Sequence, residues 1–360
     1  MTAVPTTPGP RRGYLDWLRG LAVLVMIEAH VLDSWTRLEE RSTPQWGASM
    51  ILGGFGAPLF LFLAGVAVAL SAGSKYRRSG DRVAASRAVV KRGFQIFLLA
   101  FLFRLQAMVV SWGSWMSLLK VDILNIMGPA IMAAAWVWAV ARTPRVRLVA
   151  FAGTALAIAF LTPPVRSVSW LGVLPDPIEG YLRPRSGFTA FAMFPWAAFV
   201  FAGAAIGVLI DETRAAASEA RLNAWLASGG LVLAIASYAA SFLPSPYAQS
   251  SFWTTSPAFF LLRTGILIAA IGGAYAWQQR RWRTFAFSPL EQMGRTSLFI
   301  YWIHIELIYG LMVRPLHKSM TIGEAWLGVL IVGLLMLLLS LLKDRIVLAW
   351  RAAHLVPRPS

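Results

Sequence analysis

The first candidates for chemistry are a histidine and an aspartate three residues apart in a largely apolar segment. His30 and Asp33 lie at the end of the stretch DWLRGLAVLVMIEAHVLD, residues 16–33. In a helix, this spacing places the carboxylate beside the imidazole on one face. A carboxylate that orients a histidine and supports its protonated form is the usual arrangement of a general base. Without a serine or cysteine nucleophile signature, such a histidine would act on a hydroxyl or amine, or would itself be transiently acylated.

The same stretch has a second polar position near its beginning, at Asp16 and Arg19. Arg19 and His30 are eleven residues apart, which in a helix is about 20° past three full turns and about 16 Å along the axis. The two therefore share a face and are separated by much of a hydrocarbon layer. Charges at membrane depth are costly and usually face a bundle interior, a cavity or a site. Glu28 points about 200° away from His30, so we expect it to be a structural partner for a neighbouring helix.

The composition indicates the kind of molecule that positions these groups. Of 360 residues, 58% are hydrophobic and only 14% are charged, and the mean hydropathy is +0.62. Repeated apolar runs of about 20 residues predict an all-α polytopic membrane protein. The net charge of +17 lies in short loops between these runs, which favours the positive-inside rule over binding to nucleic acid. The absence of cysteine excludes disulfides, thiolate nucleophiles, thiolate–zinc sites and iron–sulfur clusters.

We expect a bundle of about ten transmembrane helices. Residues 1–12 are predicted to be a disordered tail, residues 13–345 the integral-membrane domain, and residues 346–360 a cytoplasmic tail. Alternation of loop charge predicts that both termini are cytoplasmic. The helices are expected at about 14–35, 48–72, 93–111, 122–141, 146–162, 188–210, 224–243, 257–277, 295–313 and 322–342.

With this topology, several polar groups of other helices fall at the outer level of the membrane, near His30. Their shared level predicts a polar cavity open to the outside, in which they bind substrate or assist catalysis. Each also has a structural interpretation: Arg19, Arg104 and Arg263 could extend to headgroups or pair with acids, and His304 could be a hydrogen-bonded core histidine. The groups are Arg104, Asp122, Asn125, Arg263, His304 and Glu306.

The residues also resemble a known family. RGLAVLVMIEAH places an arginine, ten residues and a histidine in the first membrane helix. This is similar to the motif of the membrane acyltransferase superfamily, which includes acyltransferase-3 and heparan-α-glucosaminide N-acetyltransferase-like proteins. Further resemblance covers most of the chain, and the segments together look most like the bacterial heparan-α-glucosaminide acetyltransferase-like branch (DUF1624). These segments are GGFGAPLFLFLAGVAVAL, VVKRGFQIFLLAFLF, FPWAAFVFAGAAIG and MGRTSLFIYWIHIEL.

The resemblance implies an enzyme of the bacterial inner membrane. It would transfer an acyl group, usually acetyl, from cytoplasmic acyl-CoA to a hydroxyl or amine of a glycan or glycolipid acceptor on the far side. His30 matches the catalytic histidine of the family, and Arg19 matches its arginine. No metal is expected, and the oligomeric state is left open.

The geometry expected from the residues fits this task. Arg19, with Asp16 beside it and basic inner loops around it, would attract the phosphates of coenzyme A. The thioester arm could then lie along the first helix and reach His30. In our hypothesis His30, oriented by Asp33, deprotonates the acceptor in a ternary complex, and His304 or Arg263 stabilises the oxyanion. An acyl-histidine intermediate is the rival mechanism.

A function of a different class also accounts for charged groups inside the membrane. A transporter or flippase for a glycan or lipid precursor could couple to protons through the same residues, His30, Asp33, His304 and Glu306. Such proteins typically carry internal repeats with paired broken helices. The sequence shows no such repeat. Binding of acetyl-CoA is the property that separates the two functions.

Overall fold

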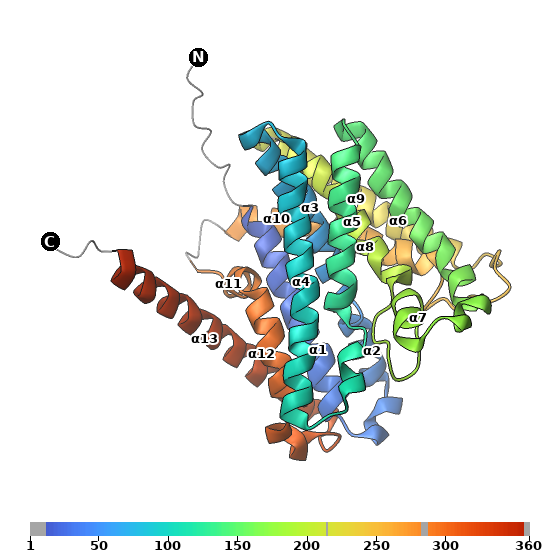
Figure 1. The fold of residues 1–360 in the computed structure, drawn as a ribbon, viewed down its shortest axis with the longest axis vertical. Helices are drawn as coiled ribbons and strands as arrows, with labels where there is room; N and C mark the ends of the chain where they lie inside the picture. Colours follow the sequence, from blue (N-terminus) through green and yellow to red (C-terminus); the bar gives the residue numbers. More distant parts are fainter. Residues whose placement is uncertain (1–11, 214, 282–286, 356–360) are drawn as a thin grey trace. The chain divides into compact units, whose positions relative to one another are not determined.

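The structure is a computed structural model that describes residues 12–213, 215–281 and 287–355. Figure 1 shows a chain of helices, and no strand forms within these described ranges. The prediction of an all-α polytopic membrane protein is confirmed. The helices belong to two compact units. We call Arg12–Ala57 with Arg280–Ser360 the terminal unit, and Pro58–Gln279 the central unit.

The terminal unit is built around α1, Gly13–Trp35, which packs against three helices from the far end of the chain. The approach of α1 to α11 is close enough to require glycine on both sides. A Cβ added at Gly20 would overlap the carbonyl oxygen of Leu290, and one added at Gly294 would overlap that of Asp16. The other elements are η1 (Leu38–Ser42), α2 (Pro44–Gly53), α11 (Pro289–Arg295), α12 (Ser297–Tyr309), η4 (Leu311–Leu316) and α13 (Ile322–Leu355).

The central unit contains most of the apolar helices. Two close pairs organise it, α4 with α5 (side by side in Figure 1) and α6 with α8. Small residues also bring α3 against α8, because Gly65 faces the backbone of Val200 and Gly203 that of Phe62. The elements are α3 (Gly56–Ser79), α4 (Arg82–Ser111), η2 (Trp115–Leu119), α5 (Ile123–Val140), α6 (Pro144–Ser167), η3 (Trp170–Val173), α7 (Asp176–Leu182), α8 (Met193–Glu212), α9 (Ala216–Ala240) and α10 (Pro257–Arg281).

Eight helices in the described part of the chain are long and apolar enough to cross a membrane. The expected ten include two more segments with particular features. The first, α1, is long enough to cross but carries the charges of Asp16, Arg19, Glu28 and Asp33. The second, predicted at 295–313, contains the 13-residue α12, which ends at Tyr309 and is followed by η4. The protein is therefore a multi-pass membrane protein, and the candidate histidines lie on two helices that are not among these eight.

Other boundaries differ from those expected. The predicted helix 48–72 is two helices, because α2 ends at Gly53 and α3 begins at Gly56. The break lies at Gly54 and Phe55, with Gly53 and Gly56 on either side of it. The last helix continues to Leu355, well into the predicted tail of residues 346–360. The predicted tail of residues 1–12 lies, except for Arg12, outside the described residues.

Candidate active site

The candidate site is centred on two histidines that are 274 residues apart in sequence. Nδ1 of His30, on α1, lies 2.9 Å from Nε2 of His304, on α12. The imidazole rings are stacked, with centroids 5.2 Å apart and planes 11° from parallel. His304 is fully buried, whereas His30 is half-buried. The pair therefore joins a buried ring to one nearer the surface through a single hydrogen bond.

The partners of His304 determine where the protons of this pair lie. Nδ1 of His304 is 2.8 Å from the carbonyl oxygen of Ile300, one turn earlier in α12. A carbonyl oxygen only accepts, so this Nδ1 carries a proton, and in the neutral ring Nε2 is an acceptor. Nδ1 of His30 is consequently the donor to His304. The lone pair of neutral His30 then lies on its other nitrogen, Nε2, as a general base requires.

Backbone and side-chain hydrogen bonds hold α1 beside α12 at this level. The carbonyl oxygen of Ile308 accepts from Ser34 Oγ at 3.3 Å and from Trp35 Nε1 at 3.1 Å. The segment after η4 adds backbone bonds, from the Lys318 amide to Ser34 and from the Met320 amide to Trp35. These bonds restrain both histidines, because Ser34 lies four residues after His30 and Ile308 lies four residues after His304.

Asp33 has different partners from the one that the sequence predicts. The Asp33 carboxylate accepts hydrogen bonds from the Tyr309 hydroxyl at 3.4 Å and from Arg41 Nη1 at 3.5 Å. Arg41 also donates to the backbone oxygen of Asp33. Tyr309 in turn meets His30 edge to face, with ring centroids 5.7 Å apart. The expected direct orientation of His30 by Asp33 is therefore corrected. His304 accepts the hydrogen bond of His30 Nδ1. Asp33 contacts the Tyr309 hydroxyl, and the Tyr309 ring in turn contacts the His30 imidazole.

The other end of α1 carries Asp16 and Arg19. Arg19 Nη1 donates to Asp16 Oδ1 at 3.0 Å, within one turn of the same helix. The carboxylate is buried, while the guanidinium is partly accessible. Part of the Arg19 charge is thus balanced locally. Asp16 acts on Arg19 rather than facing a ligand by itself.

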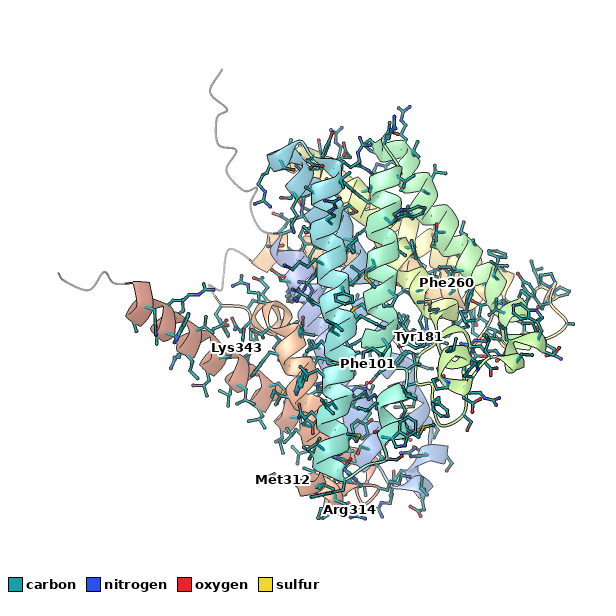
Figure 2. All side chains as sticks on the ribbon, viewed as in Figure 1. Phe101, Tyr181, Phe260, Met312, Arg314 and Lys343 are labelled. Carbon is teal, nitrogen blue, oxygen red and sulfur yellow. The ribbon has the colours of Figure 1, made fainter. Side chains whose placement is uncertain are left out.

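Two of the residues predicted to bind substrate lie at the start of a helix of the central unit, and a third pairs with one of them. Asp122 and Asn125 form a capping box at the start of α5, in which each side chain accepts from a backbone amide. Arg104 Nη2 pairs with Asp122 at 3.0 Å, and Asn125 donates to the hydroxyl of Tyr181, labelled in Figure 2, at 3.3 Å. Burial raises the pKa of Tyr181, and the bond from Asn125 opposes this shift. The structure thus favours the structural interpretation of these side chains.

Three further charged residues each have their own surroundings: Arg263, Glu306 and Glu28. The guanidinium of Arg263, on α10 of the central unit, lies 4.0 Å from the centre of the Phe259 ring. Glu306 is two residues after His304 and so points about 200° away around α12. Glu28 is only 2% exposed and lies against Gly53 of α2. Within the described part of the chain, its two carboxylate oxygens have no hydrogen-bond partner.

Sequence reasoning missed the groups that surround Asp33. Arg41 and Trp46 were assigned no role, although the Arg41 guanidinium lies 4.8 Å from the centre of the Trp46 ring. Tyr309 likewise had no predicted role. A signal was available in the eight-residue separation of Asp33 and Arg41 at the end of the first helix. The described residues contain no group of three or more histidines and acids placed to hold a metal ion.

Comparison with known proteins gives a family for this chain. A model of the family described as "Heparan-alpha-glucosaminide N-acetyltransferase, catalytic" matches residues 11–239. Curated proteins give no match. The matched segment contains Arg19, His30 and Asp33, whereas His304 lies beyond it. The match covers more than half of the chain, so the protein is a membrane enzyme of acetyltransferase type that belongs to the heparan-alpha-glucosaminide N-acetyltransferase catalytic family.

Proposed function

We propose that the protein transfers an acetyl group from acetyl-CoA to an amine or hydroxyl of a sugar acceptor, with His30 as the general base. The observation that supports this most strongly is the hydrogen bond from His30 Nδ1 to His304 Nε2. It leaves the lone pair of His30 on Nε2, where it can take a proton from an acceptor. The family of the chain supports acetyl transfer as the reaction.

The chemistry then follows in two proton transfers. Nε2 of His30 takes the proton as the acceptor nitrogen or oxygen forms a bond to the thioester carbon. The tetrahedral intermediate collapses, the carbon–sulfur bond breaks, and the imidazolium returns the proton to the leaving thiolate. The products are the acetylated acceptor and coenzyme A. Charge on His30 is transient, and the acceptor nitrogen of His304 stabilises it through the shared hydrogen bond.

The positioning role belongs to His304, since both of its ring nitrogens are hydrogen-bonded inside the protein. It would have to break one of these bonds to donate to an oxyanion. Of the two groups predicted to stabilise the oxyanion, Arg263 therefore keeps that role as a prediction.

The donor is proposed to approach from the Arg19 end of α1. A guanidinium that is partly accessible and already oriented by Asp16 is suited to bind a phosphate of the nucleotide. The axial distance of about 16 Å between the Arg19 and His30 positions suits a ligand with a charged end and a long thin arm. In this proposal the Arg19 end faces the cytoplasm, and the His30 end faces the outer side.

Purified full-length protein, radiolabelled acetyl-CoA and a panel of sugar acceptors provide the test. His30→Ala is expected to lower kcat by about 10²- to 10⁴-fold, the usual contribution of general acid–base catalysis. Full activity of this variant would refute the role of His30. Label that stays on His30 without acceptor would replace the ternary complex with an acyl-histidine mechanism. Absence of both acetyl-CoA binding and transfer would favour the transporter hypothesis.

A further inference from the structure

A continuous row of side chains leads away from His30 in the terminal unit. The row begins with the edge-to-face contact between His30 and Tyr309. The Tyr309 hydroxyl contacts Asp33, and Asp33 pairs with Arg41. The Arg41 guanidinium ends the row above the Trp46 ring. We call Asp33, Arg41, Trp46 and Tyr309 the polar rim. Its members come from α1, η1, α2 and α12, so four elements meet beside the candidate base.

The rim is open, and the contacts of the Asp33 carboxylate are long, while Arg41 also donates to the Asp33 backbone oxygen. The side chain of Asp33 is 56% exposed, and Tyr309 is 42% exposed. The contacts of the Asp33 carboxylate, at 3.5 and 3.4 Å, are longer than strong charge-assisted hydrogen bonds. Nε of Arg41 is buried and has no hydrogen-bond partner among the described residues. Such a row can exchange its weak contacts for stronger ones to a ligand.

The chemistry of the rim matches a sugar ring more closely than an anion. An ionised carboxylate accepts from two hydroxyls, while a guanidinium donates to hydroxyl and ring oxygens. An aromatic ring such as that of Tyr309 offers an apolar face for the C–H groups of a pyranose and a polar hydroxyl at its edge. Asp33 and Arg41 together are neutral, so the rim lacks the excess positive charge that would select a phosphate or carboxylate ligand.

We propose that the polar rim is the acceptor-binding subsite and recognises a pyranose through a pair of neighbouring hydroxyls. Asp33 accepts from these hydroxyls, Arg41 donates to them, and the Tyr309 ring packs against the sugar. The bound ring presents its amine or hydroxyl to Nε2 of His30. The inference deepens the proposed acetyl transfer and rests on it. It assigns acceptor selectivity to Asp33 and Arg41, separately from the proton transfer at His30.

The test uses the full-length protein in lipid nanodiscs with acetyl-CoA, methyl α-glucosaminide and its 3-deoxy and 4-deoxy analogues. Arg41→Met keeps the side-chain stem and removes the donors. It is expected to raise the acceptor KM by about 10- to 100-fold while the acetyl-CoA KM stays unchanged. Arg41→Lys should be intermediate, because it keeps the charge without the planar fork. The matched control is Arg314→Met, at an exposed arginine of η4 in the same unit (Figure 2).

Asp33→Asn provides the second measurement. Wild-type protein should reject at least one deoxy analogue about 10-fold or more, because removal of the hydroxyl leaves a rim group unpaired. Asp33→Asn should lose most of that discrimination, since its amide oxygen accepts more weakly. The unfolding midpoint of each variant separates a lost contact from a lost fold. Equal acceptor KM values for Arg41→Met and Arg314→Met, or equal use of all analogues by wild-type protein, would overturn the proposal.

A binding measurement without acetyl-CoA separates this proposal from the proposed function. Calorimetric titration of methyl α-glucosaminide should show binding to wild-type protein and to Arg314→Met, with at least 10-fold weaker binding to Arg41→Met. If wild-type protein binds the sugar but transfers no acetyl group, the proposed reaction fails and the sugar site stands. If wild-type protein transfers acetyl and its sugar affinity does not depend on Arg41, the rim proposal fails and the reaction stands.

Discussion

At the scale of single residues, the structure changes which side chain supports the candidate base. The sequence places a carboxylate three residues from His30, but the hydrogen bond of His30 Nδ1 is accepted by His304. His304 is itself held by the carbonyl of Ile300. The Ile300 carbonyl fixes the proton of His304 on Nδ1, so His304 Nε2 accepts the proton of His30 Nδ1. The lone pair of His30 is therefore on Nε2. The tautomer of His30 therefore depends on a backbone atom of another helix.

A direct prediction is that His304→Phe lowers kcat by about 10²-fold, because the ring volume remains while the acceptor for His30 Nδ1 is lost. His304→Gln should recover part of this loss, since an amide oxygen can accept the same proton. Transfer kinetics with saturating acetyl-CoA measure both effects. His354→Ala, at an exposed histidine near the end of α13, serves as control. Wild-type kcat in His304→Phe would contradict the positioning role.

At the scale of elements, the predicted substrate residues Asp122 and Asn125 show that polar side chains in a membrane protein can have a structural role at the start of a helix. Asp122 and Asn125 satisfy amides at the first turn of α5, and Arg104 balances the Asp122 charge. A helix start leaves four amides without intrahelical partners, so a polar pair at that point has a structural reason to exist. The same argument does not apply to His30, which lies within α1.

We therefore expect Asp122→Ala to change stability rather than acceptor binding. Loss of an N-cap costs about 0.5–2 kcal/mol, and loss of the Arg104 partner adds to this cost. Thr143→Ala removes the N-cap of α6, which has no such ion pair, and should destabilise less. Thermal unfolding in detergent compares the two, and the acceptor KM of each should equal that of wild type. A raised acceptor KM with an unchanged unfolding midpoint would return Asp122 to the substrate site.

At the scale of the whole molecule, the basic loops and the apolar helices define an orientation that can be tested. Eight helices of the described chain qualify as spans by length and composition. The basic residues at the end of α3 and the start of α4, on either side of the short connection at Gly80 and Asp81, are predicted to be cytoplasmic. The loop that follows α12 is predicted to be outside. This orientation supplies the two compartments that transfer across a membrane requires.

The natural absence of cysteine makes the measurement simple. A single cysteine at Met312, which is 99% exposed, should react with an impermeant maleimide in intact cells. A single cysteine at Ser79, the last residue of α3 at its basic end, should react only after permeabilisation. Labelling of both positions from the same side of intact cells would refute the orientation and, with it, the separation of donor and acceptor sides.

Much of the organisation follows from the sequence because it depends on local properties. Apolar length predicts the helices, since a helix satisfies its own backbone hydrogen bonds in lipid. The spacing of Arg19 and His30 places both on one face of α1, because helical geometry is regular. The breaks at Gly54 and Gly310, inside the predicted helices 48–72 and 295–313, were not predicted. Each depends on how a segment packs, in addition to its residues.

What only the tertiary structure decided is which groups meet. His304 joins His30 across 274 residues, and Asp33 is held by Arg41 and Tyr309. No spacing rule reaches across separate helices, because the relative position of two helices is determined by side-chain packing and glycine contacts such as those at Gly20 and Gly294. The sequence by itself therefore determined a charged first helix with a base at one end. The tertiary fold decided which nitrogen of that base holds the lone pair, because an acceptor on a distant helix selects the tautomer.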